Sequence, residues 1–452
     1  MEILKKFRKS IMFLLKAVIV LSLLVVFTYT WEKYYPDTYL NNGNYVIIFT
    51  YLLSFIAFTV LYGGFKIGVF RTTEIVYSMS LGAVFANVIV FGELCLVVRK
   101  VVSPLPILAV TCIDVLLIML LAFISNKIYR SLFDTKKILA IYDGTKDNIE
   151  TIRKIHSMRS RYRIEHAITI DKGLDAVKNE IDESDKVFIG DIDKELKGEI
   201  IKYAYIHQKR MYILPSIDEI IYSCSEIIQV RDCPIIYCRN NGLTIEQKIL
   251  KRAMDLIVSS FALLIFSPVM LIISLAIKLY DGGPVFFKQK RITEGNREFD
   301  VLKFRSMVVN ADEIAARKAV EDDDRITAVG KFIRPLRLDE LPQLINILKG
   351  DMSLVGPRPE RVENVIEYTE MIPEFPKRHM VKGGLTGYAQ IYGKYNTSPK
   401  DKLNMDLIYI ERYSLLMDIK LIILTLKILF MRESTEGFKE SNSAVISIDD
   451  KK

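Results

Sequence analysis

Four apolar runs occur before residue 125, and they constrain the fold of this chain more than any other feature. They cover residues 11–30, 45–62, 75–98 and 105–124, each close to the ~20 residues that cross a bilayer. The first run is too long for a secretion signal, and three similar runs follow it, so we interpret it as an anchor. Since 50% of the 452 residues are hydrophobic, we predict a multidomain membrane protein.

Basic residues in the short loops predict the orientation of these spans. They occur at residues 5–9 before the first run, at Lys66 and Arg71 after the second, and at residues 126–137 after the fourth. Two basic residues in the opposite loop weaken this bias without reversing it. Because basic loops stay in the cytoplasm, we expect both ends of a four-helix transmembrane bundle, residues 1–130, on the cytoplasmic side.

Two acidic residues, Glu93 and Asp114, fall inside the predicted spans. An ionisable residue at membrane depth is a functional hypothesis by default. The alternatives are a pairing with Lys16 inside the bundle, or an interfacial position for Glu93. The sequence assigns no role to either acid.

The chain changes character after the fourth span. Short β-rich runs alternate with segments of helical period, which is typical of a parallel α/β sheet. The β-rich runs are residues 136–143, 163–170, 185–191, 209–215 and 225–230, and the helical segments include residues 146–158 and 194–206. We predict a Rossmann-like cytoplasmic domain over residues 131–240. Its first strand is followed by one glycine, Gly144, where a dinucleotide fingerprint has three, which favours assembly or regulation over a cofactor site.

Residues 254–277 form a fifth apolar segment, which Ser267 and Pro268 interrupt in the middle. Proline lacks a backbone donor and bends helices. Basic residues flank both ends of the segment, so the charge rule places both ends in the cytoplasm. We therefore predict a helix that enters the membrane, bends and leaves on the same face, with an ordinary fifth span as the alternative.

Two adjacent acids, Asp339 and Glu340, follow Arg334 and Arg337 and precede an apolar pattern of helical spacing over residues 341–348. We expect these acids to open a helix that stops at Gly350, with Pro342 tolerated in its first turn. A carboxylate among arginines stays ionised at neutral pH, which suits a nucleophile. Taken alone, such acids more commonly form surface ion pairs. His379 is the only histidine after residue 207, which excludes a histidine triad or histidine metal cage in this half.

The strings "DGGPVFFKQKR", "DVLKFRSM", "DDDRITAVGKFIRPLRLDELPQLINILKGDMSLVGPRPE" and "VKGGLTGYAQIYG" follow one another in this half of the chain. Together they closely resemble the bacterial sugar transferase family, the polyprenyl-phosphate hexose-1-phosphate transferases, in its large multidomain form. The resemblance implies a monotopic α/β catalytic domain, residues 246–432, with a re-entrant helix over residues 254–277 that breaks at Ser267 and Pro268. A polar tail, residues 433–452, follows it.

The resemblance also implies a reaction. A UDP-sugar donates hexose 1-phosphate to undecaprenyl phosphate, UMP leaves, and a surface glycan such as exopolysaccharide, capsule or O-antigen begins. By position, Asp339 is the nucleophile that forms a covalent phosphosugar, and Glu340 holds Mg²⁺. The resemblance assigns the donor and lipid phosphates to the basic residues Lys303, Arg305, Arg337 and Arg358. The acidic run 321–324 is read as a solvated loop in preference to a second metal site. Where the family commonly has a Lys-Pro-Gly turn, this chain has Lys382, Gly383 and Gly384, which we expect to form a more flexible turn. The resemblance leaves the donor sugar open, because residues of the stretch "GLTGYAQIYG" are the ones that would recognise it.

These features predict a multi-pass protein of the bacterial inner membrane with its catalytic domain on the cytoplasmic face. The expected partners are the UDP-sugar, undecaprenyl phosphate and membrane lipid, without nucleic acid, and a homodimer through the bundle or the α/β domain is compatible with the sequence. A catalytically inactive scaffold that binds anionic lipid and recruits glycan enzymes is the alternative function.

Overall fold

The computed structural model describes residues 7–35, 43–133, 137–157, 163–238, 242–309, 325–393 and 397–429. The described residues up to Ser216 form one compact unit, and those from Ile217 form a second. The predicted polar tail, residues 433–452, and the acidic run 321–324 lie outside the described residues.

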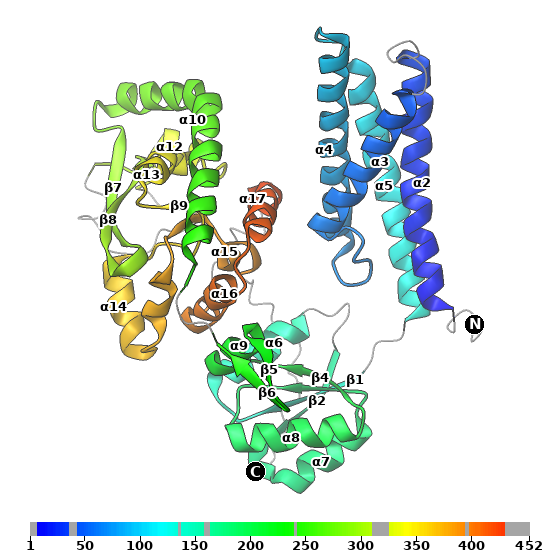
Figure 1. Cartoon of the computed structure of the whole chain (residues 1–452), viewed down its shortest axis with the longest axis vertical. Helices are drawn as coiled ribbons and strands as arrows, with labels where there is room; N and C mark the ends of the chain where they lie inside the picture. The colour runs from blue at the N-terminus through cyan, green and yellow to red at the C-terminus, as the bar shows by residue number, and fades with distance from the viewer. Residues whose placement is uncertain are drawn as a thin grey trace. The chain divides into compact units, whose positions relative to one another are not determined.

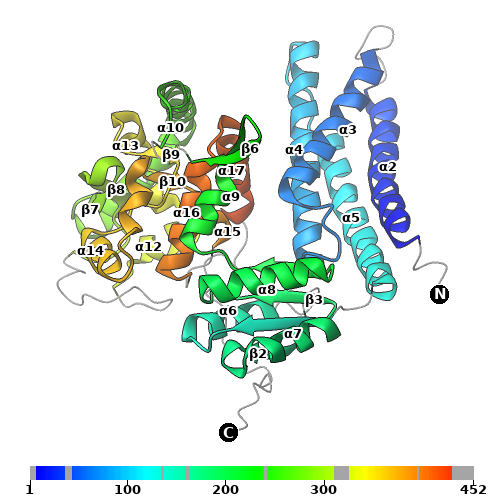
Figure 2. The ribbon, with the colours of Figure 1, turned by 60° about the horizontal axis from the view of Figure 1, so that its bottom comes forward.

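The four N-terminal apolar runs all form helices, as predicted. They lie side by side in both views (Figures 1 and 2), with Leu23, Ile47, Ile75 and Ile118 in one shared core. Their bounds are Arg8–Tyr34 for α2, Gly43–Tyr62 for α3, Thr72–Val98 for α4 and Leu105–Leu132 for α5. Each is long and apolar enough to cross a membrane, and so is a fifth helix, α10, which spans Ile245–Asp281.

Asp114 is fully buried among three of these helices. Its Oδ2 atom accepts a hydrogen bond from the Tyr51 hydroxyl at 3.1 Å and another from the Asn87 amide at 3.2 Å. Among the described residues, its partners are therefore neutral side chains and not Lys16. Glu93 is partly exposed and makes no hydrogen bond or ion pair with a described residue.

A four-stranded parallel sheet follows, in the order β2-β1-β3-β4. Alternate residues of β1 face opposite layers: Ile138 packs with Ile152 of α6, whereas Leu139 packs with Val177 of α7 and Ile200 of α8. Figure 1 shows α7 and α8 along one face of the sheet. The bounds are Lys137–Tyr142 for β1, Lys146–Ser157 for α6, Arg163–Thr169 for β2, Ile170–Lys172 for η1, Leu174–Glu183 for α7, Lys186–Ile189 for β3, Lys194–Ile206 for α8 and Arg210–Ile213 for β4.

The fifth predicted strand does not join this sheet. It forms β5, Glu226–Val230, which pairs antiparallel with β6, Cys233–Tyr237. A two-residue turn, Arg231 and Asp232, joins the two strands, with Arg231 in the left-handed region at φ 56°. A short turn of this kind favours a hairpin partner over a distant parallel one, which alternating β-rich runs cannot reveal.

The second unit is built mainly from helices around one long helix, α10, and a β-hairpin, β7 with β8 (Figure 1). Its remaining bounds are Ile217–Cys224 for α9, Ile245–Asp281 for α10, Phe286–Ile292 for β7, Glu294–Asn296 for η2, Glu298–Phe304 for β8, Ala328–Ile333 for α12, Leu338–Glu340 for η3, Gln343–Lys349 for α13, Ser353–Val355 for β9, Val362–Met371 for α14, Phe375–Met380 for η4, Gly384–Thr386 for β10, Tyr388–Tyr392 for α15, Pro399–Glu411 for α16 and Leu415–Leu429 for α17.

Helix α10 is 37 residues long and changes direction sharply (Figure 1). Pro268 is its one internal proline, and sharp bends in helices arise at such positions. Proline has no N–H to donate to the carbonyl of Leu264, four residues earlier. Ser267 Oγ donates to that carbonyl instead, at 2.8 Å. The hydroxyl of Ser267 thus satisfies the carbonyl that the proline leaves without its usual donor.

One side chain of α13 fixes this short helix against the hairpin. The Asn346 amide accepts a hydrogen bond from the Leu302 N–H at 2.9 Å and donates to the Asp300 carbonyl at 2.8 Å. Asn346 thus replaces the missing neighbour strand at the edge of β8. Leu344 and Ile347, on the same short helix, are buried in the core of the unit. This arrangement holds Lys303, near the end of β8, close to the turn that precedes α13.

Candidate active site

The two adjacent acids lie in the one-turn helix η3, and α13 begins only at Gln343, after Pro342. The prediction that Asp339 and Glu340 open the longer helix is therefore wrong by one turn. Arg337 precedes η3 in the left-handed region, at φ 53°, and its carbonyl accepts from the Glu340 N–H at 3.2 Å. The predicted stop is confirmed, because Gly350 caps α13 at φ 92°.

Glu340 meets two of the predicted cations. Its Oε1 atom accepts from Lys303 Nζ at 3.0 Å and from Arg358 Nη2 at 2.9 Å. The side chains of Glu340 and Lys303 are only 13% and 20% exposed, so water screens this pair weakly. Burial alone would raise the pKa of Glu340, but Arg358 and Lys303 hold it well below its usual range. Glu340 is thus a fixed negative charge.

Asp339 lies beside this group without sharing its partners. Burial and the neighbouring Glu340 charge raise the pKa of Asp339 to about 6, against the opposing effects of Lys303 and Arg334. The carboxyl group is therefore still ionised at neutral pH, as predicted, although its pKa is raised. Its carboxylate makes no hydrogen bond with another described side chain. An ionised oxygen without a side-chain partner among the described residues, next to cations that could hold a substrate anion, can act as a nucleophile.

The other predicted site residues are not all in this group. Arg305 is buried and pairs with Asp281 at the end of α10, and its Nε and Nη1 atoms have no partner among the described residues. The side chain of Arg337 is partly exposed and makes no hydrogen bond or ion pair with a described residue. Ser267 and Pro268 lie within α10, as described above.

Two further arginines belong to the same surroundings: Arg334, which precedes the acids in the chain but was given no phosphate role from sequence, and Arg291, which was not predicted. Arg334 opposes the rise in the pKa of Asp339, and its buried Nη1 atom has no partner among the described residues. Arg291 donates to the carbonyl of Pro359 at 2.6 Å, and burial and Arg358 lower its pKa to about 10. Arg334 lies three positions before Arg337, and this spacing alone does not predict a binding role. The position of Arg291 depends on its pairing with Arg361, 70 residues later, which no local pattern indicates.

A close backbone approach positions Arg358. Strands β9 and β10 pair in parallel, and the Gly356 N–H donates to the Thr386 carbonyl at 2.9 Å. A Cβ on Gly384 would lie 2.1 Å from the Gly356 nitrogen, which leaves no room for a side chain. The close contact of Gly356 with the backbone of Gly384 and Thr386 therefore holds the loop that carries Arg358.

The donor set of the acidic pair fits Mg²⁺. No cluster of three or more His, Cys, Asp or Glu side chains occurs in the described part of the chain. Mg²⁺, however, typically uses one or two carboxylates together with substrate phosphates. The Glu340 Oε2 atom and the Asp339 carboxylate have no hydrogen bond with another described side chain, so both are available to such an ion.

Comparison with known proteins identifies the second half of the chain. Residues 246–432 match the model of the bacterial sugar transferase family. A sugar transferase of Bacillus subtilis is 39% identical over 194 residues, which cover 43% of this chain and 92% of that protein.

Larger relatives match over the same region. The UDP-N-acetylgalactosamine-undecaprenyl-phosphate N-acetylgalactosaminephosphotransferase of Aeromonas hydrophila is 44% identical over 181 residues, 39% of this chain and 43% of that protein. The UDP-glucose:undecaprenyl-phosphate glucose-1-phosphate transferase of Escherichia coli is 40% identical over 206 residues, 44% of each chain. The match thus spans less than half of these two relatives.

Proposed function

Because the chain belongs to the bacterial sugar transferase family, we propose that it transfers hexose 1-phosphate from a UDP-sugar to undecaprenyl phosphate. The observation that carries this proposal is that two neighbouring carboxylates differ in their partners. Lys303 and Arg358 neutralise Glu340, whereas the Asp339 carboxylate has no side-chain hydrogen bond with a described residue. The names of the relatives from Aeromonas hydrophila and Escherichia coli give a UDP-sugar and undecaprenyl phosphate as their substrates. An inactive scaffold is not favoured, because these relatives are named as transferases.

In the first step, an Asp339 oxygen attacks the β-phosphorus of the UDP-sugar. A bond forms between the carboxylate and phosphorus, the bond to the bridging oxygen breaks, and that oxygen leaves with UMP. No proton has to move, because the nucleophile is ionised at neutral pH. We assign Arg334 to the diphosphate, because its buried Nη1 atom has no partner among the described residues.

In the second step, an oxygen of undecaprenyl phosphate attacks the same phosphorus. The bond to Asp339 breaks, the carboxylate returns, and the lipid diphosphosugar leaves. The incoming phosphate is already anionic, so the step needs no histidine base. Arg337 and Arg305 still have donors without partners among the described residues, which supports their assignment to phosphate.

We assign Mg²⁺ to Glu340, with Asp339 and the donor diphosphate close by. When bound, the ion would offset the repulsion between the carboxylates and the diphosphate. Lys303 and Arg358 hold the Glu340 carboxylate in one orientation through Oε1, which leaves Oε2 for the ion. These two cations also reduce the repulsion that Glu340 exerts on a second anion.

We further propose that α10 is re-entrant and that the catalytic domain lies on the cytoplasmic face of the bacterial inner membrane. The bend of α10 and the Ser267 hydrogen bond to Leu264 support this topology. A bend at membrane depth leaves a carbonyl without its usual partner, and the serine supplies one. Basic residues at both ends of the helix agree with a common cytoplasmic side.

Replacing Pro268 by Leu tests the topology. Leucine restores the N–H donor and favours a straight helix, so the chain after residue 278 should move toward the outer side. A single cysteine introduced at Lys288 in a chain without its own cysteines is then labelled in intact cells with a membrane-impermeant thiol reagent. We expect labelling only in the Leu variant, and protection in both forms would show that proline does not set the bend.

Release of UMP by the purified full chain tests the function. We expect release to require a UDP-sugar, undecaprenyl phosphate and Mg²⁺ together for sustained turnover. A panel of UDP-hexoses and UDP-N-acetylhexosamines identifies the donor. If no UDP-sugar yields UMP under these conditions, while the protein still binds anionic lipid and other glycan enzymes, the scaffold function replaces the transferase.

A further inference from the structure

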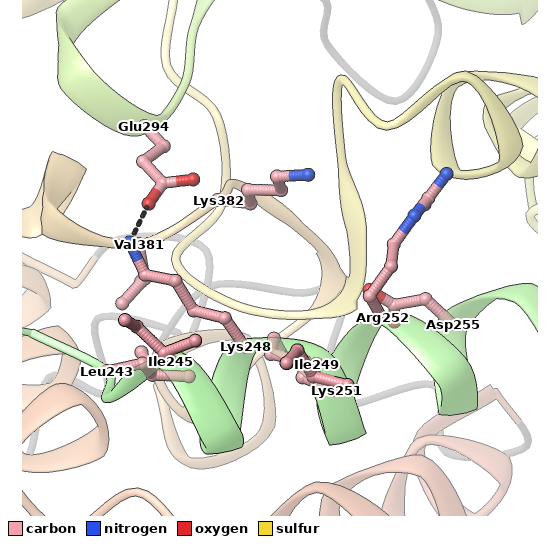
Figure 3. Close-up of a pocket in the computed structure, with 10 residues that line it drawn as sticks. All are labelled: Leu243, Ile245, Lys248, Ile249, Lys251, Arg252, Asp255, Glu294, Val381 and Lys382. Carbon is pink, nitrogen blue, oxygen red and sulfur yellow. Dashed lines mark hydrogen bonds and ion pairs between the residues drawn. The ribbon is translucent and has the colours of Figure 1, made fainter.

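A cavity of about 530 Å³ lies along the first turns of α10, away from the acidic pair. Figure 3 shows its lining, which combines apolar side chains with basic ones. Arg252, one of the lining residues, donates to the carbonyls of Ile347 and Leu348 at 2.6 Å and 2.7 Å, at the C-terminal end of α13. Asp339 and Glu340 precede the other end of that helix, which is roughly 10 Å long at 1.5 Å per residue. The cavity is therefore a separate feature.

Two of the four basic residues of the cavity are neutralised. Lys251 pairs with the buried Asp418 at 2.5 Å, and Lys248 pairs with Glu294 at 2.9 Å. Lys382 is partly buried and makes no hydrogen bond or ion pair with a described residue. One basic side chain of the cavity is thus left without a partner in the described part of the chain.

Two carboxylates line the cavity, and both are engaged elsewhere. Asp255 Oδ1 accepts from the Ser353 hydroxyl at 3.0 Å and from the Leu354 N–H at 2.9 Å. Glu294 holds Lys248. Neither forms an ion pair with Lys382 or Arg252.

The two remaining cations, Arg252 and Lys382, both lie close to Gly350. A Cβ atom placed on Gly350 would lie 3.5 Å from Arg252 Nη2 and 3.7 Å from Lys382 Nζ. Figure 3 shows Arg252 extending upward from α10, and Lys382, from a separate segment above the helix, extending toward Arg252. Burial and the Arg252 charge lower the pKa of Lys382, which is the expected effect of two like charges held together. An anion bound between them would remove this repulsion.

The apolar part of the lining continues along α10. Ile245 and Ile249 line the cavity and are 73% and 63% exposed. Further along the same helix, Ile257, Phe261 and Leu264 are 70%, 64% and 73% exposed. Because α10 is apolar enough for a membrane, this surface can accept acyl chains.

We propose that this cavity binds the phosphodiester headgroup of an anionic membrane lipid, with the phosphate between Lys382 and Arg252 and the acyl chains along α10. Inorganic phosphate would share the two cations but not the apolar surface. The proposed lipid is not the acceptor in the transfer reaction, because the site lies at the opposite end of α13 from Asp339. Its effect would be to hold the catalytic domain at the membrane surface.

Chemical labelling of lysines tests the site without any transfer reaction. The full chain is placed in phosphatidylcholine nanodiscs, with or without phosphatidylglycerol, and acetylated briefly with an amine-reactive ester. Peptide mass spectrometry then compares Lys382 with Lys377, an exposed lysine that does not line the cavity. A bound anion raises the pKa of Lys382, so we expect its labelling to slow by about tenfold with phosphatidylglycerol, relative to Lys377.

Two outcomes would overturn the proposal. Equal slowing at Lys382 and Lys377 would show only the surface potential of the bilayer. Full protection of Lys382 by millimolar inorganic phosphate in phosphatidylcholine discs would identify a site for free phosphate.

Variants provide an independent measurement. Native mass spectrometry of the full chain, titrated with phosphatidylglycerol, should show one tightly retained lipid in the wild type, in Lys382→Arg and in the control Lys377→Gln. Lys382→Gln should lose it. Retention of that lipid by Lys382→Gln would contradict the site even if UMP release is normal, so its failure is distinguishable from failure of the proposed transferase function.

Discussion

The two ends of α13 carry opposite unpaired charges. At the N-terminal end, Lys303 and Arg358 neutralise Glu340, and Asp339 remains a carboxylate without a side-chain partner. Near the C-terminal end, Lys248 and Lys251 each pair with a carboxylate, whereas Lys382 has no acidic partner among the described residues. Each end thus contains a satisfied ionic group beside an unsatisfied one. An unpaired charge in a partly buried position is costly unless a ligand completes it, which makes these positions the candidates for chemistry and for binding.

The two adjacent acids at the N-terminal end of α13 have different surroundings and different roles. Asp339 and Glu340 are neighbours in the chain, yet their pKa values move in opposite directions. Titratable groups that their surroundings separate in this way usually have different chemical tasks. Glu340 is a fixed charge that other groups orient, and Asp339 is the group that can react.

The largest expected effect is the loss of turnover in Asp339→Asn. The amide keeps the shape of the side chain but has no anionic oxygen, so we expect UMP release to fall by about 10³-fold or more. UDP-sugar binding, measured by calorimetry, should survive. The matched control is Asp351→Asn, just beyond the other end of α13, where the acid pairs with the 57% exposed Arg297. This control should stay within about twofold of the wild type.

If Asp339→Asn turns over about as fast as the control, the N-terminal end of α13 would have no special role in the reaction. It would leave the acidic pair as a structural ion-pair group, and the nucleophile would have to be sought elsewhere.

The pH dependence of kcat/KM gives the next largest effect. Because the pKa of Asp339 is about 6, its nucleophilic form is lost below that value. We expect kcat/KM to be level above about pH 7 and to fall about tenfold per pH unit below about pH 5.5. Arg334 opposes the rise in this pKa, so Arg334→Gln should move the acid limb to higher pH. An acid limb that stays in place would show that Arg334 does not act on Asp339.

Stability should respond in opposite directions to the loss of the two acids. The pKa of Asp339 is higher in the folded protein than in the unfolded chain, so ionisation reduces stability progressively from about pH 4 to pH 6 and fully above that. Asp339→Asn should therefore stabilise the protein by about 1–3 kcal/mol at pH 7.5, with the gain vanishing near pH 4.

Ionisation of Glu340 affects stability in the opposite direction, because it stabilises the folded protein. Its pKa is depressed in the folded protein, so its stabilisation is present above the unfolded pKa and is lost only as the pH falls through the much lower folded value. Glu340→Gln leaves Lys303 and Arg358 without their acid and should cost about 2 kcal/mol at pH 7.5. Thermal unfolding of both variants in detergent measures the two shifts, and shifts of the same sign would contradict the assigned environments.

Local pattern predicted the parts of this fold that depend on neighbours in the chain. The apolar runs became helices α2–α5 and α10, and four of the β-rich runs became the parallel sheet, because period and length decide these elements. The turn at Gly350 was also predictable, since its left-handed conformation suits glycine. The fifth β-rich run was misplaced, because its partner β6 could not be recognised from period alone.

The candidate site was predicted in its residues but not in its contacts. Motif resemblance selected Asp339, Glu340, Lys303 and Arg358, whereas the sharing of Glu340 Oε1 by two cations depends on how β8 and the loop after β9 meet η3. Arg305 was grouped with them, and its pairing with Asp281 could not be predicted from the motif. The lipid cavity joins Arg252 to Lys382, 130 positions later, and no local pattern connects such distant residues.

Trapping the covalent phosphosugar tests the central claim most directly. The full chain is mixed with UDP-sugar labelled with ³²P in the β-phosphate, without undecaprenyl phosphate, and quenched within milliseconds. We expect label on the peptide that contains Asp339, released on adding the lipid acceptor and absent in Asp339→Asn. Formation of lipid-linked product by the wild type while no label ever appears on the polypeptide would contradict a nucleophilic role for Asp339 and indicate direct transfer between the two substrates.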